Sequence, residues 1–274
     1  QLSCDYPVDC LMLPNNNLLL ADKDGHKIME VGSRGKIFWT FDTHASGRHS
    51  LRNPVRVTYR YEDDNSMRLL VVDQGNHRVL EVDKNNEIYW EFGVQGEAGG
   101  HGKHLDTPSD IQYTHDNTYL IADTGNHRVI EIKGGSIHRE WGEKFELKSP
   151  TCAQRLLNDH TLILDAGNYR LLELDENGQM VRESTYYSRE IDEEFRVVHP
   201  IKMIRLLNKD VLIMDEDKLI QVMLNTNKLV WYSKLDDLAY QPQVQEPEII
   251  IDEHGNERRV YKLIDHGEMR PVRL

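Results

Sequence analysis

Three long polar segments of this sequence carry histidines whose imidazole rings could bind a metal ion. The segments are residues 43–54, 94–108 and 185–200, and their histidines are His44, His49, His101, His104 and His199. Imidazole is a frequent ligand of zinc, copper and nickel. His101 and His104 are the first candidates because they are the closest pair, although no cysteine or stricter ligand pattern accompanies them. The alternative is that all five are solvated side chains of glycine-rich loops.

Charged side chains recur at a second set of positions, two residues after a proline. These positions are Asp9, Arg56, Asp110, Cys152, Lys202 and Ile249. If each proline begins a strand and the strands stand around one axis, the six side chains form one layer. We favour a layer of ion pairs that neutralise one another. The alternative is a pocket for a small ligand, in which Asp9 and Asp110 bind a cation or transfer protons. Arg56 and Lys202 would instead suit an anionic ligand.

An internal repeat tells which elements position these residues. The repeated phrases are DKDGHKIMEV from Asp22, DQGNHRVLEV from Asp73, DTGNHRVIEI from Asp123, DAGNYRLLEL from Asp165, DEDKLIQV from Asp215 and DHGEMRPVRL from Asp265. Their spacing of 42 to 51 residues is typical of one propeller blade for each repeat. Each unit has a proline, an apolar run before the aspartate, and a turn after the repeated phrase. This pattern predicts four short strands joined by Gly, Asn and Asp turns.

Six such units predict an all-β, six-bladed β-propeller of four-stranded antiparallel blades in a single domain, 1–274. The expected blades are 7–53, 54–107, 108–149, 150–199, 200–246, and 247–274 together with 1–6. Stacking the units around an axis covers both faces of each sheet. The last unit reaches Leu274 just after its third strand, so we expect residues 1–6 to supply its fourth strand. The alternative is that the chain lacks residues at one end.

The unit resembles the NHL repeat, whose hallmark is an Asp, a small turn, and then Asn, His or Tyr, Arg and Val before a strand. The match is close at 73–82, 123–132 and 165–174, partial at 22–31, and weak at Asp215 and Asp265. The resemblance implies a propeller but no single activity, because this fold carries binding modules and enzymes. Related propellers include calcium-dependent lactonases and a zinc-dependent amidating lyase. The lyase's metal ligands are not matched residue by residue in this sequence, so none of their roles is carried over.

The histidines of the repeat itself are expected to be structural. His26, His77 and His127 recur at one place in successive units, with Tyr169 in the fourth. A catalytic group is needed once, so recurrence with the fold favours a role in the fold. The aspartate of each unit is expected to accept hydrogen bonds from the turn or from the following arginine.

Composition limits the partners of the chain. Its 274 residues carry a net charge of −13, with 39% hydrophobic residues. Such a charge repels phosphates, so we expect no nucleic-acid partner, and the absence of a long apolar run predicts no membrane insertion. Cys4 and Cys10 could form a small disulfide loop, or all three cysteines could be reduced thiols.

We therefore expect a non-enzymatic propeller that binds or assembles a protein partner. The chain begins with Gln1 rather than Met, as a mature exported protein or a shortened chain would. We expect an extracellular or periplasmic location. The alternative function is a metal-dependent lyase or hydrolase at the channel mouth that uses His101, His104, Asp110 and Arg56. The expected cofactor is accordingly none, or a zinc or calcium ion, and a small ligand is a further candidate partner.

Overall fold

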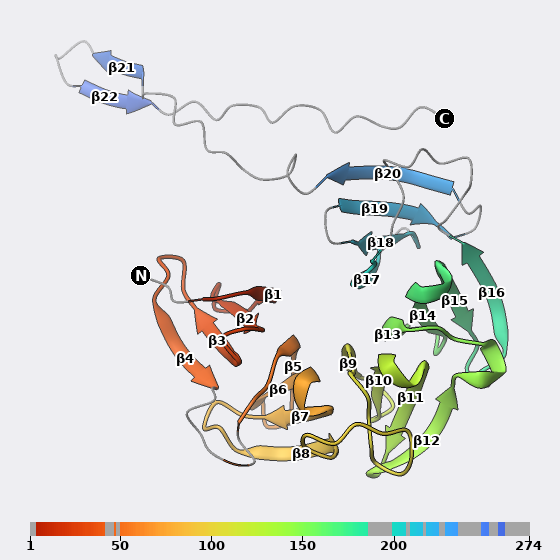
Figure 1. Cartoon of the computed structure of the whole chain (residues 1–274). Coiled ribbons are helices and arrows are strands. Elements are labelled where there is room, and N and C mark those ends of the chain that lie inside the picture. Colours follow the sequence, from red (N-terminus) through yellow and green to blue (C-terminus); the bar gives the residue numbers. More distant parts are fainter. Residues whose placement is uncertain are drawn as a thin grey trace.

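The protein is an all-β chain whose blades follow one another around a common axis in a computed structural model (Figure 1). The structure describes residues 4–41, 47, 50–185, 199–206, 209–215, 218–224, 228–234, 248–251 and 257–260. These residues form five four-stranded sheets, in each of which successive strands are antiparallel neighbours. The innermost strands are β1, β5, β9, β13 and β17 (Figure 1).

The five blades have the following strands. Blade 1 consists of β1 (Pro7–Met12), β2 (Leu18–Asp22), β3 (Lys27–Val31) and β4 (Ile37–Phe41). Blade 2 consists of β5 (Pro54–Tyr61), β6 (Met67–Asp73), β7 (Arg78–Val82) and β8 (Ile88–Gly93). Blade 3 consists of β9 (Asp110–Tyr113), β10 (Tyr119–Asp123), β11 (Arg128–Lys133) and β12 (Ser136–Trp141). Blade 4 consists of β13 (Pro150–Arg155), β14 (Thr161–Asp165), β15 (Arg170–Leu174) and β16 (Met180–Thr185). Blade 5 consists of β17 (Lys202–Arg205), β18 (Val211–Met214), β19 (Lys218–Met223) and β20 (Lys228–Lys234).

Short 3-10 helices replace simple turns at the repeated phrase. They are η2 (Gln74–Asn76), η3 (Thr124–Asn126) and η5 (Ala166–Asn168), and a fourth, η4 (Glu143–Phe145), follows β12. Each of the first three ends at the repeat's His or Tyr, which adopts left-handed backbone angles, with φ of 54° to 55°. The glycine inside the turn is required by a close approach, because a Cβ on Gly75 would lie 2.7 Å from the Arg52 carbonyl oxygen.

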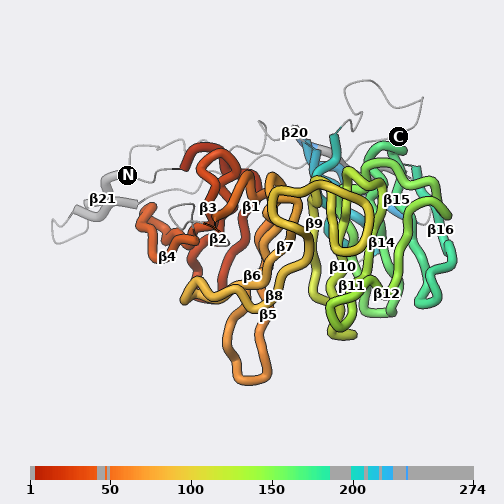
Figure 2. Tube along the Cα trace, turned by 60° about the horizontal axis from the view of Figure 1, so that its bottom comes forward, coloured from red at the N-terminus to blue at the C-terminus, as the bar shows by residue number. Residues whose placement is uncertain are grey.

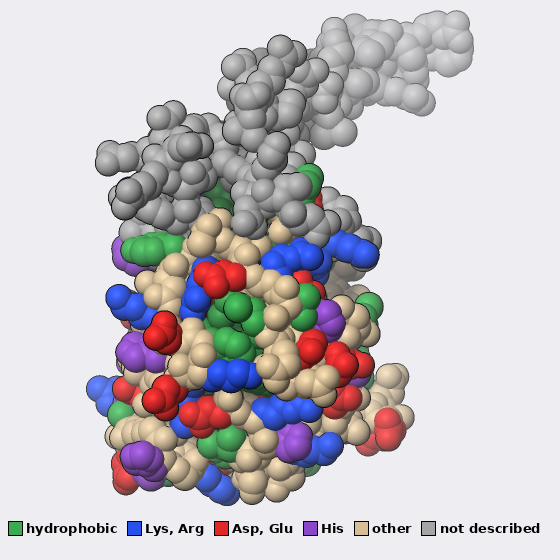
Figure 3. All heavy atoms as spheres, turned by 90° about the vertical axis from the view of Figure 1, so that its right-hand side faces the viewer, with side chains coloured by type: hydrophobic (Ala, Val, Ile, Leu, Met, Phe, Trp, Pro, Cys, Tyr) green, Lys and Arg blue, Asp and Glu red, His purple; other side chains and the backbone are tan. Residues whose placement is uncertain are grey.

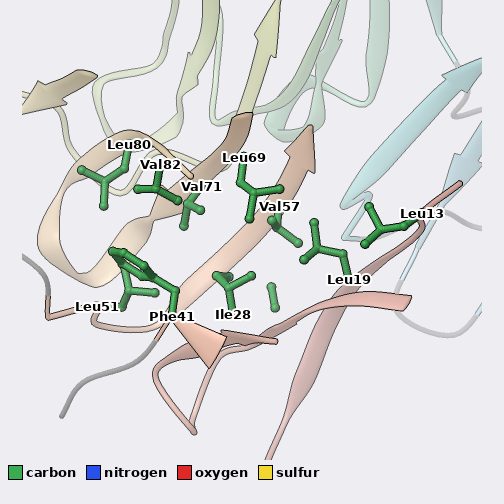
Figure 4. Packing of buried hydrophobic residues seen from close by; sticks show 11 residues of the cluster. Leu13, Leu19, Ile28, Phe41, Leu51, Val57, Leu69, Val71, Leu80 and Val82 are labelled. Atoms are coloured by element: carbon green, nitrogen blue, oxygen red, sulfur yellow. The ribbon is translucent and has the colours of Figure 1, made fainter. Parts of the chain in front are cut away.

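Burial of the middle strands explains their sequence pattern. All five residues of β14 are buried and its centre reads Leu-Ile-Leu, whereas the outer strand β12 alternates between exposed and less exposed positions. A strand covered on both faces reads as a continuous apolar run, and a strand with one solvent face alternates. Apolar clusters therefore lie between neighbouring blades. In the cluster between blades 1 and 2, Leu19 and Ile28 face Val57 and Leu69 (Figure 4).

The two ends of the blades form different surfaces. We call one end the motif face, which holds the beginnings of the innermost strands and the turns η2, η3 and η5. The opposite end is the hairpin face, which holds the turns between the first and second strands of each blade, 13–17, 62–66, 114–118, 156–160 and 206–210. The β5–β6 hairpin projects beyond its neighbours on this face (Figure 2).

The expectation of six blades is wrong, because the described residues form five. Within the described part of the chain, β21 (Glu248–Ile251) and β22 (Glu257–Val260) form a separate two-stranded sheet. Of the expected closing segment, 1–6, the backbone N–H groups of Asp5 and Tyr6 donate to the Asp22 carboxylate of blade 1, as the loop before the innermost strand does in blades 2 to 4. The rest of that segment, 1–3, and residues 261–274 lie outside the described residues.

Two further expectations concern the cysteines and membranes. Cys4, Cys10 and Cys152 are all free thiols, which matches the reduced alternative. The described residues contain no helix that is long and apolar enough to cross a membrane.

Candidate functional site

The repeated phrase builds a turn around its aspartate. Asp73 is fully buried and accepts hydrogen bonds from the Arg52 backbone N–H at 2.7 Å, from Asn76 Nδ2 at 2.8 Å and from Arg78 Nε at 2.8 Å. The same three kinds of donor surround Asp123 and Asp165. The Asp, Asn and Arg of the phrase therefore fasten the turn to the loop that enters the same blade, as the sequence predicted for the aspartate and arginine.

The histidine of the phrase links each blade to the next. His77 Nδ1 accepts a hydrogen bond from the Thr107 backbone N–H at 3.1 Å, immediately before the proline of blade 3. Equivalent bonds join His26 to Asn53 and His127 to Ser149, both at 3.0 Å. The three donor residues have positive φ angles of 44° to 48°, which are unfavourable for residues other than glycine and need such support. The prediction that the repeated histidines are structural is confirmed.

The charged channel positions meet in one network near the axis. Arg56 lies between two acids, with Nε 3.0 Å from Asp110 Oδ1 and Nη1 3.5 Å from Asp9 Oδ1. Lys202 of blade 5 places Nζ 2.7 Å from the same Asp9 oxygen. The structure thus brings together all four predicted residues, Asp9, Arg56, Asp110 and Lys202. The network contains two acids and two cations, so its charges balance.

Backbone groups complete this network. The Val57 backbone N–H donates to Asp9 Oδ2 at 3.1 Å, and the Ala153 backbone N–H donates to Asp110 Oδ2 at 3.2 Å. Each acid thus binds the innermost strand of the following blade. Both acids are largely buried, with exposures of 7% and 8%, so their oxygens are already engaged by cations and N–H donors. Both acids thus serve as ion-pair and hydrogen-bond acceptors that join neighbouring blades.

The ionisation of the network follows from its geometry. Burial alone lowers the pKa of Arg56, but the carboxylates of Asp110 and Asp9 outweigh burial and raise it. Burial raises the pKa of the neighbouring Cys152 thiol well above its ordinary value, and the Asp110 charge adds to this effect. Cys152 is therefore a neutral thiol. A nucleophilic cysteine needs a lowered pKa, whereas the pKa of Cys152 is raised.

A cavity of about 610 Å³ opens above the network on the motif face. Residues from all five blades line it, namely Tyr6, Pro7, Val8, Lys23, Val55, Arg56, Gln74, Ser109, Thr124, Thr151, Ile201, Lys202 and Met214. We call this space the axial cavity. Its volume lies within the range of about 300–1,000 Å³ that is usual for ligand pockets. Its charged lining residues are all cations, and within the described residues the Lys23 ammonium group makes no ion pair or hydrogen bond.

Hydroxyl groups at the rim of the axial cavity serve mainly to join blades. Thr124 Oγ1 donates to the Pro150 carbonyl, and Thr151 Oγ1 donates to the Pro200 carbonyl, both at 2.8 Å. Gln74 Nε2 makes the corresponding bond to the Pro108 carbonyl at 3.2 Å. These contacts hold the rim rigidly, since each side chain bridges two blades.

The predicted metal ligands are only partly described. His104 lies with Nδ1 3.1 Å from the His101 carbonyl and Nε2 3.4 Å from the Glu97 carboxylate, and His101 is exposed. The His199 backbone N–H donates to Asp215, while His44 and His49 lie outside the described residues. Metal binding by His101 and His104 therefore stays a prediction.

Among the described residues, one group of three side chains could hold a metal ion. It consists of the exposed side chains of His115, Asp116 and Asp159 on the hairpin face. His115 Nε2 lies 2.6 Å from Asp159 Oδ1, so the group has an ordinary surface ion pair between two turns. It lies at the opposite end of the blades from the axial cavity.

Sequence reasoning missed a set of buried glutamates at one position of the repeat, three of which contact the next blade. They are Glu30, Glu81, Glu131 and Glu173, each eight residues after the aspartate of its repeat. Glu131 Oε1 lies 2.8 Å from Arg155 Nη2 of blade 4, and Glu81 accepts a hydrogen bond from Tyr119 of blade 3. The recurrence of glutamate in four repeated phrases was a visible signal for this role.

Acidic, basic and histidine side chains are interspersed on the outer side of the ring around β12 and β16, beside a small hydrophobic group (Figure 3). Like charges are thus mixed with opposite ones on this side despite the net charge of −13. The axial cavity, where cations from three blades converge, differs from this mixture and is the better candidate for a binding site.

Comparison with known proteins establishes the class of the fold. The chain resembles a streptogramin B lyase structure, with a TM-score of 0.59 and 9% identity over 95% of this chain and 84% of the other. A gluconolactonase from Xanthomonas campestris gives a TM-score of 0.58 and 11% identity, covering 83% and 75% of the two chains. A protein of unknown function from Bacteroides caccae gives 0.59 and 15%, covering 86% and 83%. At such identities the likeness shows a β-propeller and nothing finer.

No family model matches the sequence, and no curated protein matches it either. The NHL family predicted from the repeated phrase is therefore not confirmed. The structural neighbours are propellers of the lyase and gluconolactonase type.

Proposed function

We propose that this protein is a non-enzymatic binding propeller that receives an anionic group of its partner in the axial cavity. One observation carries the proposal: the cavity is lined by cations, while the two nearby acids are already engaged. Asp9 and Asp110 bind Arg56, Lys202 and backbone N–H groups, so each of their oxygens already has a cation or an N–H group as partner. Lys23 adds a positive charge that no described acid pairs with.

The expected partner is a protein that presents a carboxylate, such as an acidic side chain or a chain terminus. The carboxylate would meet Lys23 and Lys202 in a partly apolar pocket beside Val55 and Ile201. Charge-assisted hydrogen bonds in such a pocket are stronger than those between neutral groups. An extracellular or periplasmic location belongs to the same proposal and needs its own test by fractionation.

The test is capture from a native extract on immobilised protein, with and without Lys23→Gln. This change removes one of the three positive charges that line the cavity and leaves the ion pairs of Arg56 and Lys202 with Asp9 and Asp110 intact. Lys103→Gln is the matched control, because Lys103 is exposed on a loop outside the cavity. A partner retained by wild type and the control, and lost with Lys23→Gln, supports the proposal. Equal retention by all three proteins contradicts it.

The alternative predicted from the sequence, a metal-dependent lyase or hydrolase, predicts a different result. A metal-dependent enzyme would retain zinc or calcium at one ion per chain in native mass spectrometry. His101→Ala combined with His104→Ala would then remove the ion without unfolding the chain. That outcome would replace the binding proposal.

A further inference from the structure

A second cavity lies on the hairpin face, at the interface between blades 4 and 5. Its volume is about 700 Å³, and its lining includes Gln154, Arg182, Arg205, Lys209 and Glu173. The innermost strands end here, whereas they begin at the axial cavity, so the two cavities occupy opposite ends of the blades. We call this second space the hairpin-face cavity.

The repeat shows what this interface would look like if it matched its neighbour. Arg155 and Arg205 hold equivalent positions, each five residues after the proline of its blade. Glu131 and Glu173 are also equivalent, each eight residues after its aspartate. Between blades 3 and 4, Arg155 Nη2 lies 2.8 Å from Glu131 Oε1, and both side chains are buried. The interface between blades 3 and 4 thus contains a complete buried ion pair.

The interface between blades 4 and 5 departs from this pattern. Glu173 turns to a histidine of its own blade, with Oε1 2.9 Å from His160 Nδ1. Among the described residues, no carboxylate lies within 4.0 Å of the Arg205 guanidinium, and its buried Nη1 has no hydrogen-bond partner. An unsatisfied buried donor is costly, so a partner from outside the chain would be stabilising here.

The surroundings of Arg205 are positively charged. Arg182 of β16 and Lys209 of the β17–β18 turn also line the cavity, where Glu173 is the single acid among the lining residues. Burial lowers the pKa of Arg205, and the positive charge of Arg182 lowers it further, although Glu173 and Asp210 oppose this. An anion in the cavity would relieve that repulsion between the two arginines.

An uncharged donor stands beside the arginines. Gln154 Oε1 accepts the Arg205 backbone N–H at 3.4 Å, which fixes the amide group at the end of β13. Its Nε2 donates no hydrogen bond to any described residue and lines the same cavity. A guanidinium fork together with an amide N–H is the donor set that binds carboxylate and phosphate oxygens.

We propose that the hairpin-face cavity binds a small oxyanion, a carboxylate or a phosphate, through Arg205, Arg182, Lys209 and Gln154. The site is independent of the axial cavity and goes beyond the proposed function. The site lies where Arg205 and Glu173 do not form the ion pair that Arg155 and Glu131 form one blade earlier. The ligand completes, from outside, the contact that Glu131 makes for Arg155 one blade earlier.

The test is isothermal titration calorimetry of the whole chain at low ionic strength, with inorganic phosphate and succinate as separate probes. Binding of either probe is expected in the wild type, and the probe that binds identifies the anion. Arg205→Gln should weaken binding about tenfold or more, because it removes the charge-assisted hydrogen bonds to the anion. Arg139→Gln is the matched control, since Arg139 of β12 pairs with Glu131 in the register in which Arg182 pairs with Glu173. It should leave binding unchanged.

Two further variants make the result decisive. Lys209→Gln changes an exposed turn residue of the same cavity and should weaken binding even if Arg205→Gln fails to fold. Lys23→Gln, in the axial cavity, should have no effect on the probe. Absence of binding for both probes overturns the proposal, as does binding that survives both Arg205→Gln and Lys209→Gln. Loss of binding with Lys23→Gln alone places the anion in the axial cavity and overturns it as well.

Discussion

Replacing Asp73 by alanine tests whether the repeated phrase holds the blades together. Asp73 is fully buried, and its carboxylate faces Arg78, which is only 1% exposed. Removal of the acid leaves the Arg78 charge without its buried counter-ion, although the Ser50 carbonyl still accepts from it at 3.0 Å. Breaking a buried ion pair by removing one partner costs about 3–5 kcal/mol. We therefore expect Asp73→Ala to lower the free energy of unfolding by that amount.

The measurement is equilibrium unfolding in urea, followed by tryptophan fluorescence and circular dichroism. Asp64→Ala is the control, because Asp64 is an exposed residue of the β5–β6 turn whose carboxylate accepts the Ser66 backbone N–H. It should stay within about 0.5 kcal/mol of wild type. The double variant Asp73→Ala with Arg78→Met removes the stranded charge and should regain part of the loss. A loss below about 1 kcal/mol for Asp73→Ala would refute this account of the repeat.

Three other changes examine single contacts between or within blades. His77→Leu removes the acceptor of the Thr107 backbone N–H and should cost about 1–3 kcal/mol in urea unfolding, and an unchanged midpoint would contradict the bridging role. Glu131→Ala strands the buried Arg155 and should cost about 3–5 kcal/mol, more than the same change at the exposed Glu140. Asp22→Asn tests pH dependence: burial alone raises the pKa of Asp22, but the N–H groups of Tyr6 and Asp5 outweigh it and hold the pKa below its ordinary value. Its stabilising effect is therefore present above about pH 4 and lost as the pH falls further. The melting temperatures of wild type and Asp22→Asn should differ at pH 7 and converge at acidic pH, and a constant gap would contradict the assignment.

Most of the fold could be predicted from the sequence because the sequence contains a regular repeat. The regular return of the Asp phrase and of the prolines located the four strands of blades 1 to 5. The prediction of a sixth blade was wrong because the spacing of repeats does not show whether strands pair. A repeated phrase such as that at Asp265 predicts a repeat unit, whereas a blade also needs four paired strands. Only the structure shows that the described residues form five four-stranded blades and that β21 and β22 pair as a separate sheet.

The candidate sites were readable in part. Alternation along the innermost strands placed Asp9, Arg56 and Asp110 at one level, and that placement is what the structure shows. Their mutual ion pairs depend on distances between blades, which the sequence does not give. The hairpin-face cavity could not be predicted, because Arg205 and Arg155 look alike in the sequence.

The sequence by itself determined the strand pattern and the turns of this propeller, because these depend on neighbouring residues along one chain. The regular positions of Asp73, Asn76 and Arg78 are sufficient to specify the turn that they build. Tertiary structure decided which charges meet and which lack a partner. Glu173 and Arg205 are 32 residues apart, and whether they pair depends on the orientation of side chains from two blades and on competition from His160. Long-range electrostatics is thus the property that only the folded ring determines.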